Sequence, residues 1–185
     1  MDVTALVLCG GSSRRLGRDK LAEPLGSTTV LDVTLAGLPV QWSVVCVGPE
    51  RPTARGVAWT LEQPPGGGPV PAIAAGLAQV TTPVVVVIAG DMPFAGPWAV
   101  RLADAVAASA VDAVAARDGD DRLNPLLCAY RTASLRAAMP LDPAGRPARQ
   151  LLLGLGHDTL RVPEVDAVDV DTPEALAAAR RRVGP

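Results

Sequence analysis

Eleven consecutive residues near the start of the sequence carry the groups that bind phosphate. The segment Gly10–Lys20 begins with two glycines, whose N–H groups can approach an anion closely and which tolerate positive φ. Two serines add hydroxyl donors, and three arginines with Lys20 add four cations against the single carboxylate of Asp19. In a chain of net charge -2, this segment indicates a small anionic ligand such as a nucleoside triphosphate, with a solvated basic loop as the alternative.

The order of residues in this segment separates it from two familiar phosphate loops. It contains neither G-x-x-x-x-G-K-[ST], the pattern of ATPase P-loops, nor G-x-G-x-x-G, the pattern of dinucleotide-binding turns. The sequence therefore supports neither of these classes of protein.

Two further loops carry groups suited to a nucleotide. Asp91 follows the apolar run Val84–Ala89, where a carboxylate could hold Mg²⁺ between phosphate oxygens or simply end the strand in a turn. The segment Glu62–Pro69 has prolines that stiffen it and glycines that would let it pack against a flat ligand such as a base. Taken alone, this second segment indicates only a loop.

The elements that must position these loops alternate along the chain. Apolar, β-branched runs predict strands, and Ala- and Leu-rich segments between them predict helices. This alternation predicts an α/β protein of one domain over residues 1–185, a three-layer α/β/α Rossmann-like fold with a mostly parallel sheet. In such a sheet, ligands bind beyond the carboxyl ends of the strands, where all three loops would lie.

The bounds of these elements follow from the same patterns. The predicted strands are Val3–Cys9, Ser43–Val47, Val57–Leu61, Val84–Ala89, Val111–Ala116 and Leu126–Tyr130, with short extended pieces at Leu160–Val162 and Val168–Val170. The predicted helices are Val30–Leu38, Ala72–Val80, Pro97–Ser109, Ala133–Met139, Ala148–Leu153 and Glu174–Arg182. A Pro/Gly loop is predicted at Gln63–Pro71.

Composition argues against several other kinds of protein. Aromatic residues make up 3% of the chain and no bulk basic surface is available, so we expect no nucleic-acid partner. Cys9, Cys46 and Cys128 lie in apolar runs without C-x-x-C spacing, which predicts buried free thiols in a reducing compartment. With one histidine, His157, a zinc site is not expected. The apolar runs are too short for a signal peptide or a membrane span, so we expect a cytoplasmic protein.

In this setting, Leu8–Lys20 resembles the nucleotide-binding signature of the molybdenum cofactor guanylyltransferases, a family of nucleotidyltransferases. Four further motifs are similar to those of the family and follow in family order over nearly the whole chain. They are Gly67-Gly68-Pro69 with Ala74-Ala75-Gly76-Leu77, Gly90-Asp91-Met92-Pro93-Phe94, Asn124-Pro125-Leu126, and Asp169-Val170-Asp171-Thr172-Pro173-Glu174. The first motif is quite specific to this superfamily, and the set is more so. The resemblance implies a fold like that of the nucleotide-diphospho-sugar transferases.

The resemblance also implies a role for individual residues. Arg15, Lys20 and Asp91 would be catalytic: the two cations would hold the phosphates, and Asp91 would bind Mg²⁺, the expected cofactor. The nucleotide-binding set would be Leu8, Cys9, Gly10, Gly11, Ser12, Lys20, Gln63, Gly68 and Asp91. Cys9 stands where the family usually has Ala, which is acceptable if only the backbone makes contact.

Three later residues are candidates for contact with the pterin substrate: Asn124, Asp169 and Asp171. Two of them, Asn124 and Asp171, have a structural alternative. Asn124 precedes a proline and could form a turn, while Asp171 or Thr172 could cap the following helix. Related superfamilies use a late Asp or Asn as a further metal ligand, so Asp169 or Asp171 could also serve that purpose.

The identity of the base depends on two features. Gln63 lies where guanine-specific members often have Asp, which can accept from both N1–H and the 2-amino group of guanine, whereas Gln offers one acceptor and one donor. Gly10-Gly11 and Gly68-Pro69, in contrast, resemble the guanine-using branch more than the cytosine-using branch, which tends to have Ala-Gly in the first motif. Guanine is therefore predicted, with cytosine as the alternative.

The implied reaction transfers GMP from GTP to the phosphate of molybdopterin or its molybdenum-loaded form and releases pyrophosphate. The alternatives are a cytidylyltransferase or other nucleotidyltransferase acting on a phosphorylated small metabolite, and a non-catalytic nucleotide-binding regulator. We further expect a monomer that makes transient contact with proteins that supply molybdopterin or accept the cofactor, without a nucleic-acid or membrane partner.

Overall fold

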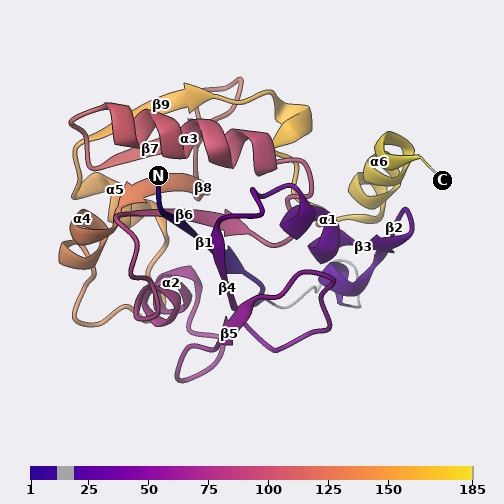
Figure 1. The fold of residues 1–185 in the computed structure, drawn as a ribbon, viewed down its shortest axis with the longest axis horizontal. Coiled ribbons are helices and arrows are strands. Elements are labelled where there is room, and N and C mark those ends of the chain that lie inside the picture. The colour runs from indigo at the N-terminus through magenta and orange to yellow at the C-terminus, as the bar shows by residue number, and fades with distance from the viewer. Residues whose placement is uncertain (12–18, 185) are drawn as a thin grey trace.

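A seven-stranded sheet runs through residues 1–11 and 19–184, the part of the chain that the computed structural model describes (Figure 1). In their order across the sheet, its strands are β5 (Ala58–Thr60), β4 (Ser43–Val47), β1 (Val3–Leu8), β6 (Val84–Ala89), β8 (Leu123–Arg131), β7 (Ala113–Arg117) and β9 (His157–Arg161). A separate hairpin pairs β2 (Pro24–Leu25) with β3 (Thr28–Thr29).

The sheet is mostly parallel, which confirms the fold predicted from the sequence. β1 runs parallel to β4 and β6, β4 to β5, and β7 to β9. β8 is antiparallel to both β6 and β7. It reverses direction because only residues 118–122 separate it from β7, whereas a parallel crossover needs a dozen residues or more.

Helices cover both faces of the sheet, and the side chains of each strand alternate between the two cores. In β6, Val84, Val86 and Ile88 enter one core, and Val85 and Val87 enter the other. The first core is covered by α1 (Val30–Ala36) and α3 (Gly96–Ala108). The second is covered by α2 (Pro69–Leu77), α4 (Thr132–Ala137) and α5 (Arg149–Leu153). This is the predicted three-layer α/β/α arrangement.

A smaller third core joins the end of the described chain to its beginning. Leu176 and Ala179 of α6 (Pro173–Val183) pack with Val170 against Leu25 of β2 and Val30 of α1. Figure 1 shows α6 beside β2, β3 and α1, away from the main sheet. The short turns η1 (Lys20–Ala22) and η2 (Glu164–Asp166) lead into this region.

Several predicted bounds change for identifiable reasons. β4 and β6 match their predicted ranges residue for residue. The helix predicted from Ala72 begins at Pro69, inside the segment predicted as loop, because proline is well suited to the first turn of a helix. Val168–Val170 is not a strand; it is a connection whose Val170 N–H donates to Asp91 O at 3.0 Å.

All three cysteines are buried and free, as predicted. Among the helices described, none is long and apolar enough for a membrane span.

Candidate active site

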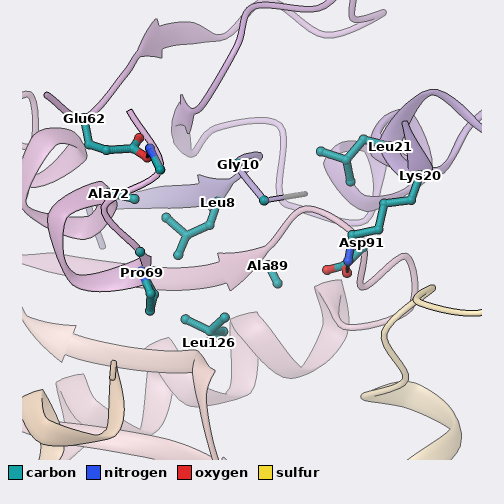
Figure 2. Close-up of a pocket in the computed structure, with 13 residues that line it drawn as sticks. Leu8, Gly10, Lys20, Leu21, Glu62, Pro69, Ala72, Ala89, Asp91 and Leu126 are labelled. Carbon is teal, nitrogen blue, oxygen red and sulfur yellow. Dashed lines mark hydrogen bonds and ion pairs between the residues drawn. The ribbon is translucent and has the colours of Figure 1, made fainter. Parts of the chain in front are cut away.

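A cavity of about 590 Å³ opens beyond the carboxyl ends of β1 and β6 (Figure 2). Its walls come from these strand ends, from both glycine-rich segments, from the η1 turn and from the start of α2. The lining residues are Leu8, Gly10, Gly11, Lys20, Leu21, Glu62, Gly66, Gly68, Pro69, Ala72, Ala89, Asp91 and Leu126. The structure thus brings the three loops singled out from the sequence to one cavity, at the edge of the sheet where ligands bind in open α/β folds.

The first glycine-rich segment leaves β1 with its backbone held closely. Gly11 has a φ of 122°, a value that glycine adopts readily and that residues with a Cβ avoid. Gly48, just after β4, has a φ of 146°, and a Cβ there would lie 2.7 Å from the carbonyl carbon of Cys9. The chain just after β4 can therefore lie this close to the chain just after β1 only because residue 48 is glycine.

Lys20 forms ion pairs with acidic residues from distant parts of the chain. Its Nζ donates to Asp91 Oδ2, as Figure 2 shows, and to Asp171 Oδ1. Asp91 is 6% exposed and follows β6 after one glycine, so the end of that strand fixes its position. Lys20 begins η1, whose N-terminus is capped by Asp19. Residues 20, 91 and 171 thus form one charged cluster at the cavity.

The carboxylates of this cluster keep Lys20 charged. Partial burial acts to lower the pKa of Lys20, but the negative charge of Asp91 and the hydrogen bonds to Asp171 and Asp91 outweigh it. The pKa of Lys20 is therefore raised above its ordinary value, and the side chain is an ammonium at neutral pH.

Asp171 reaches the cluster because the chain before α6 is tied to the end of β6. Val170 is fully buried and its N–H donates to Asp91 O at 3.0 Å. The cap of α6 is Thr172, whose hydroxyl accepts from Ala175 N at 3.2 Å. Of the two caps considered from the sequence, Thr172 is the one observed, and the Asp171 carboxylate is directed to Lys20 instead.

Asp169 lies near the same cluster, although its residue surface is exposed. Desolvation of its carboxyl by surrounding protein atoms, followed by the negative charges of Asp91 and Asp171, raises the pKa of Asp169 to about 7, against the opposing effect of Lys20. Asp169 is therefore a third carboxyl group close enough to feel the charges of Asp91, Asp171 and Lys20.

The carboxylates suit a cation that arrives with its substrate. Among the described residues, no group of three or more His, Cys, Asp or Glu side chains is placed to hold a metal ion. Asp91 and Asp171 nevertheless converge on one positive charge, the Lys20 ammonium. Mg²⁺ prefers such oxygen donors and is commonly held by one or two carboxylates together with substrate phosphates. The pair therefore fits Mg²⁺ bound with a nucleotide.

On the opposite wall, Glu62 rather than its neighbour lines the cavity. Gln63, the residue expected near the base, is exposed and is not among the lining residues. Glu62 is 6% exposed, and its Oε1 accepts from Gly66 N at 2.9 Å (Figure 2). Its Oε2 is buried and has no hydrogen-bond partner among the residues described. The sequence offered no signal that would separate these two adjacent polar side chains.

The remaining candidates lie in different surroundings. Cys9 is buried behind the cavity wall, which is consistent with contact through its backbone alone. Asn124 is not among the lining residues; it accepts from Leu126 N at 3.0 Å and donates to Met92 Sδ at 4.0 Å. Ser12 and Arg15 lie outside the described residues.

Leu126 was not expected at the cavity, and a strand irregularity accounts for its position. The partners of β7 shift from Ala115 with Cys128 to Ala116 with Asn124. Residues 125–127 therefore bulge from β8 relative to β7, and bulges of this kind redirect side chains near functional sites.

Comparison with known proteins adds independent findings. The model of the MobA-like NTP transferase domain matches residues 5–159. A Mesorhizobium japonicum protein named molybdenum cofactor guanylyltransferase is 31% identical over 202 residues, covering 97% of this chain and 95% of the relative. A Mycobacterium tuberculosis protein named "Probable molybdenum cofactor guanylyltransferase" is 33% identical over 176 residues, covering 89% of this chain and 85% of the relative.

The fold has counterparts among solved structures. The molybdopterin-guanine dinucleotide biosynthesis protein A of Archaeoglobus fulgidus superposes with a TM-score of 0.71 at 23% identity, and the alignment covers 97% of both chains. At this identity, the likeness supports the three-layer fold alone.

Proposed function

Because this chain belongs to the family of MobA-like NTP transferase domains, we propose that it transfers GMP from GTP to the phosphate of molybdenum-molybdopterin. The products are molybdopterin guanine dinucleotide cofactor and pyrophosphate. The observation that carries this proposal is the convergence of Lys20, Asp91 and Asp171 at the mouth of a glycine-lined cavity. Relatives that cover nearly the whole chain are named for the same reaction.

The chemistry requires positioning and charge more than proton transfer. An oxygen of the acceptor phosphate, already ionised at neutral pH, attacks the α-phosphorus of GTP. The new bond is a phosphoanhydride, and the bond from the α-phosphorus to the bridging oxygen breaks, so pyrophosphate leaves with the electron pair. Lys20, kept charged by its carboxylate neighbours, neutralises negative charge that develops on the phosphates.

The carboxylates of the cluster serve the cation that accompanies the nucleotide. Asp91 and Asp171 would hold Mg²⁺, and when bound it supplies charge neutralisation along the triphosphate. Lys20 is then available to the phosphates, because its present partners have another positive charge to bind. Loss of either carboxylate should therefore weaken binding of the magnesium-nucleotide complex more than binding of the free nucleotide.

We propose that the base end of GTP lies against Glu62. A carboxylate can accept from both N1–H and the 2-amino group of guanine, and one Glu62 oxygen has no partner within the described part of the chain. Leu8, Pro69 and Ala72 supply apolar surface on which a flat base can rest. This proposal assigns base recognition to Glu62 in place of Gln63, the residue expected from the sequence.

The test is incubation of the protein with Mg²⁺, molybdopterin and one of GTP, CTP or ATP, with pyrophosphate and dinucleotide product measured together. GTP should yield both products in equal amounts, and an Asp91→Asn variant should yield little of either. A clear preference for CTP would replace guanylyl by cytidylyl transfer. Tight nucleotide binding without any pyrophosphate would instead favour a non-catalytic regulator.

A further inference from the structure

Arg51 lies between β4 and β5 and contacts Cys9, the residue before the predicted phosphate segment, and Asp19, the next-to-last residue of that segment. Its Nη1 donates to the carbonyl oxygen of Cys9, the residue that follows β1, at 3.1 Å. Its Nε and Nη2 donate to the two carboxylate oxygens of Asp19 at 2.7 and 3.3 Å. One planar guanidinium therefore connects the residue before Gly10 with the residue before Lys20.

The loop that carries Arg51 is itself firmly held. Arg51 Nη1 also donates to Pro49 O at 2.7 Å, and Ala54 N donates to Asp32 Oδ1 of α1 at 2.8 Å. Arg55, four residues further, donates to the carbonyl oxygens of Leu35, in the last turn of α1, at 3.2 Å and of Leu38, just after α1, at 2.9 Å. The Arg51 side chain is 17% exposed. Its guanidinium is thus presented from a fixed support and is partly protected from water.

Through Asp19, the contact with Arg51 also restrains η1, the turn that begins with Lys20. Asp19 Oδ1 also accepts from Leu21 N at 3.2 Å and so caps η1. Partial desolvation acts to raise the pKa of Asp19, but the hydrogen bond and charge of Arg51, with the N–H groups of Leu21 and Ala22, outweigh it. The pKa therefore lies below its ordinary value, and the pair is ionised at neutral pH.

We infer that Arg51 is a positioning residue for nucleotidyl transfer, one that fixes the ends of the phosphate segment and the Lys20 turn before the nucleotide arrives. This inference rests on the proposed function. Arg51 need not touch the nucleotide. By holding Asp19 in place, it restrains the turn that begins with Lys20 in the free protein, so that binding has less conformational freedom to remove there.

The test compares Arg51→Ala and Arg51→Lys with Arg161→Ala, a matched change at an exposed arginine of β9 whose side chain donates to Gly119 O. Arg51→Ala should raise the Kd for magnesium-GTP about tenfold or more and leave the KM for molybdopterin within about twofold. Arg51→Lys should not restore binding, because a single ammonium cannot reproduce the fork that reaches both Asp19 oxygens and Cys9 O. Arg161→Ala should keep GTP affinity within about twofold of wild type.

Hydrogen exchange of the nucleotide-free proteins supplies a second readout. The amides of residues 19–22 should exchange faster in Arg51→Ala than in wild type, and those of β6 should not. Unchanged exchange and unchanged GTP affinity in Arg51→Ala would overturn the inference, as would full recovery in Arg51→Lys or an equal loss of affinity in Arg161→Ala. If wild type itself fails to bind GTP, the proposed function is what fails.

Should Arg51→Ala fail to fold, Asp19→Asn carries the same test. Asn keeps an oxygen to cap Leu21 N and loses the ion pair with Arg51, so a smaller loss of GTP affinity is expected. Wild-type affinity in Asp19→Asn would overturn the positioning role.

Discussion

Among single residues, Lys20 determines how the charges of the site are balanced. Without a nucleotide, its ammonium is bound by Asp91 and Asp171, and it offsets part of their mutual repulsion. A lysine suits this role because its compact charge sits on a flexible stem that can move from carboxylates to phosphates.

The first prediction removes this charge. Lys20→Ala or Asp91→Ala should lower kcat by roughly 10²-fold or more, the scale of a lost electrostatic contact in the transition state. Pyrophosphate release at saturating GTP measures the effect. Arg161→Ala, an exposed change on β9, should retain wild-type turnover. Near wild-type rates in both site variants would contradict the assignment.

A second prediction concerns the base. Glu62→Gln replaces one acceptor by a donor and should weaken GTP binding by about tenfold, within the range for a buried hydrogen bond to a charged group. The same substitution should weaken the binding of inosine triphosphate less, because this nucleotide lacks the 2-amino group. Titration of GTP and inosine triphosphate into the Glu62→Gln and Gln63→Ala variants shows which of the two residues contacts the base. If only Gln63→Ala loses GTP affinity, Gln63 is the residue that contacts the base.

The residue types and their neighbours placed Lys20 and Asp91 in two loops of interest, and the family resemblance then singled out these two residues. One closes a basic glycine segment and the other follows a buried strand, so both had to lie at the same edge of the sheet. Asp171 could not be separated from a helix cap, because the same residue types serve both purposes. Glu62 was missed because its side chain direction depends on the tertiary path of a loop.

At the scale of elements, two adjacent residues before α6 have different roles. Thr172 caps the helix, and Asp171 contacts Lys20. The helix supports the site through the third core, where Leu176 packs near Leu25.

The third prediction separates these tasks. Thr172→Ala should lower the free energy of unfolding by about 1 kcal/mol through loss of the cap. Asp171→Asn should have a smaller effect on stability but lower turnover, since the charge facing Lys20 is lost. Urea denaturation and pyrophosphate release, measured on both variants, test the division. An equal loss of stability in both, with equal turnover, would show that Asp171 is only part of the cap region.

The elements differ in how well the sequence predicts them. β6 was predicted to the residue because a fully buried strand must be continuously apolar. The β2–β3 hairpin was missed because each strand has two residues and lacks a periodic pattern. The orientation of β8 was not predicted from the hydrophobic pattern, which reports burial; the signal for it is the connection from β7, which is too short for a parallel crossover.

At the scale of the whole molecule, the site joins the two sides of the fold. Lys20 belongs to the N-terminal part, Asp91 to the centre of the sheet and Asp171 to the connection before α6. A ligand held by all three must therefore stabilise the contacts among them.

The fourth prediction follows from this arrangement. Magnesium-GTP at a hundred times its Kd should stabilise the fold by about 2.7 kcal/mol. For a chain of this length, that corresponds to a rise in Tm of roughly 5–10 °C. Asp91→Asn should lose the part of the shift that depends on Mg²⁺. Thermal unfolding with GTP, with and without Mg²⁺, provides the measurement, and ATP serves as the comparison. No shift with GTP would contradict the assigned cavity.

The distant position of Asp171 has a consequence for synthesis on the ribosome. The last strand of the sheet ends at Arg161 and the family match ends at residue 159, so all seven described strands emerge before this carboxylate. A nascent chain can thus form the walls around a nucleotide while its charged cluster is still incomplete. We expect competence for transfer to begin only when the segment after β9 has left the exit tunnel and Val170 has bonded to Asp91 O.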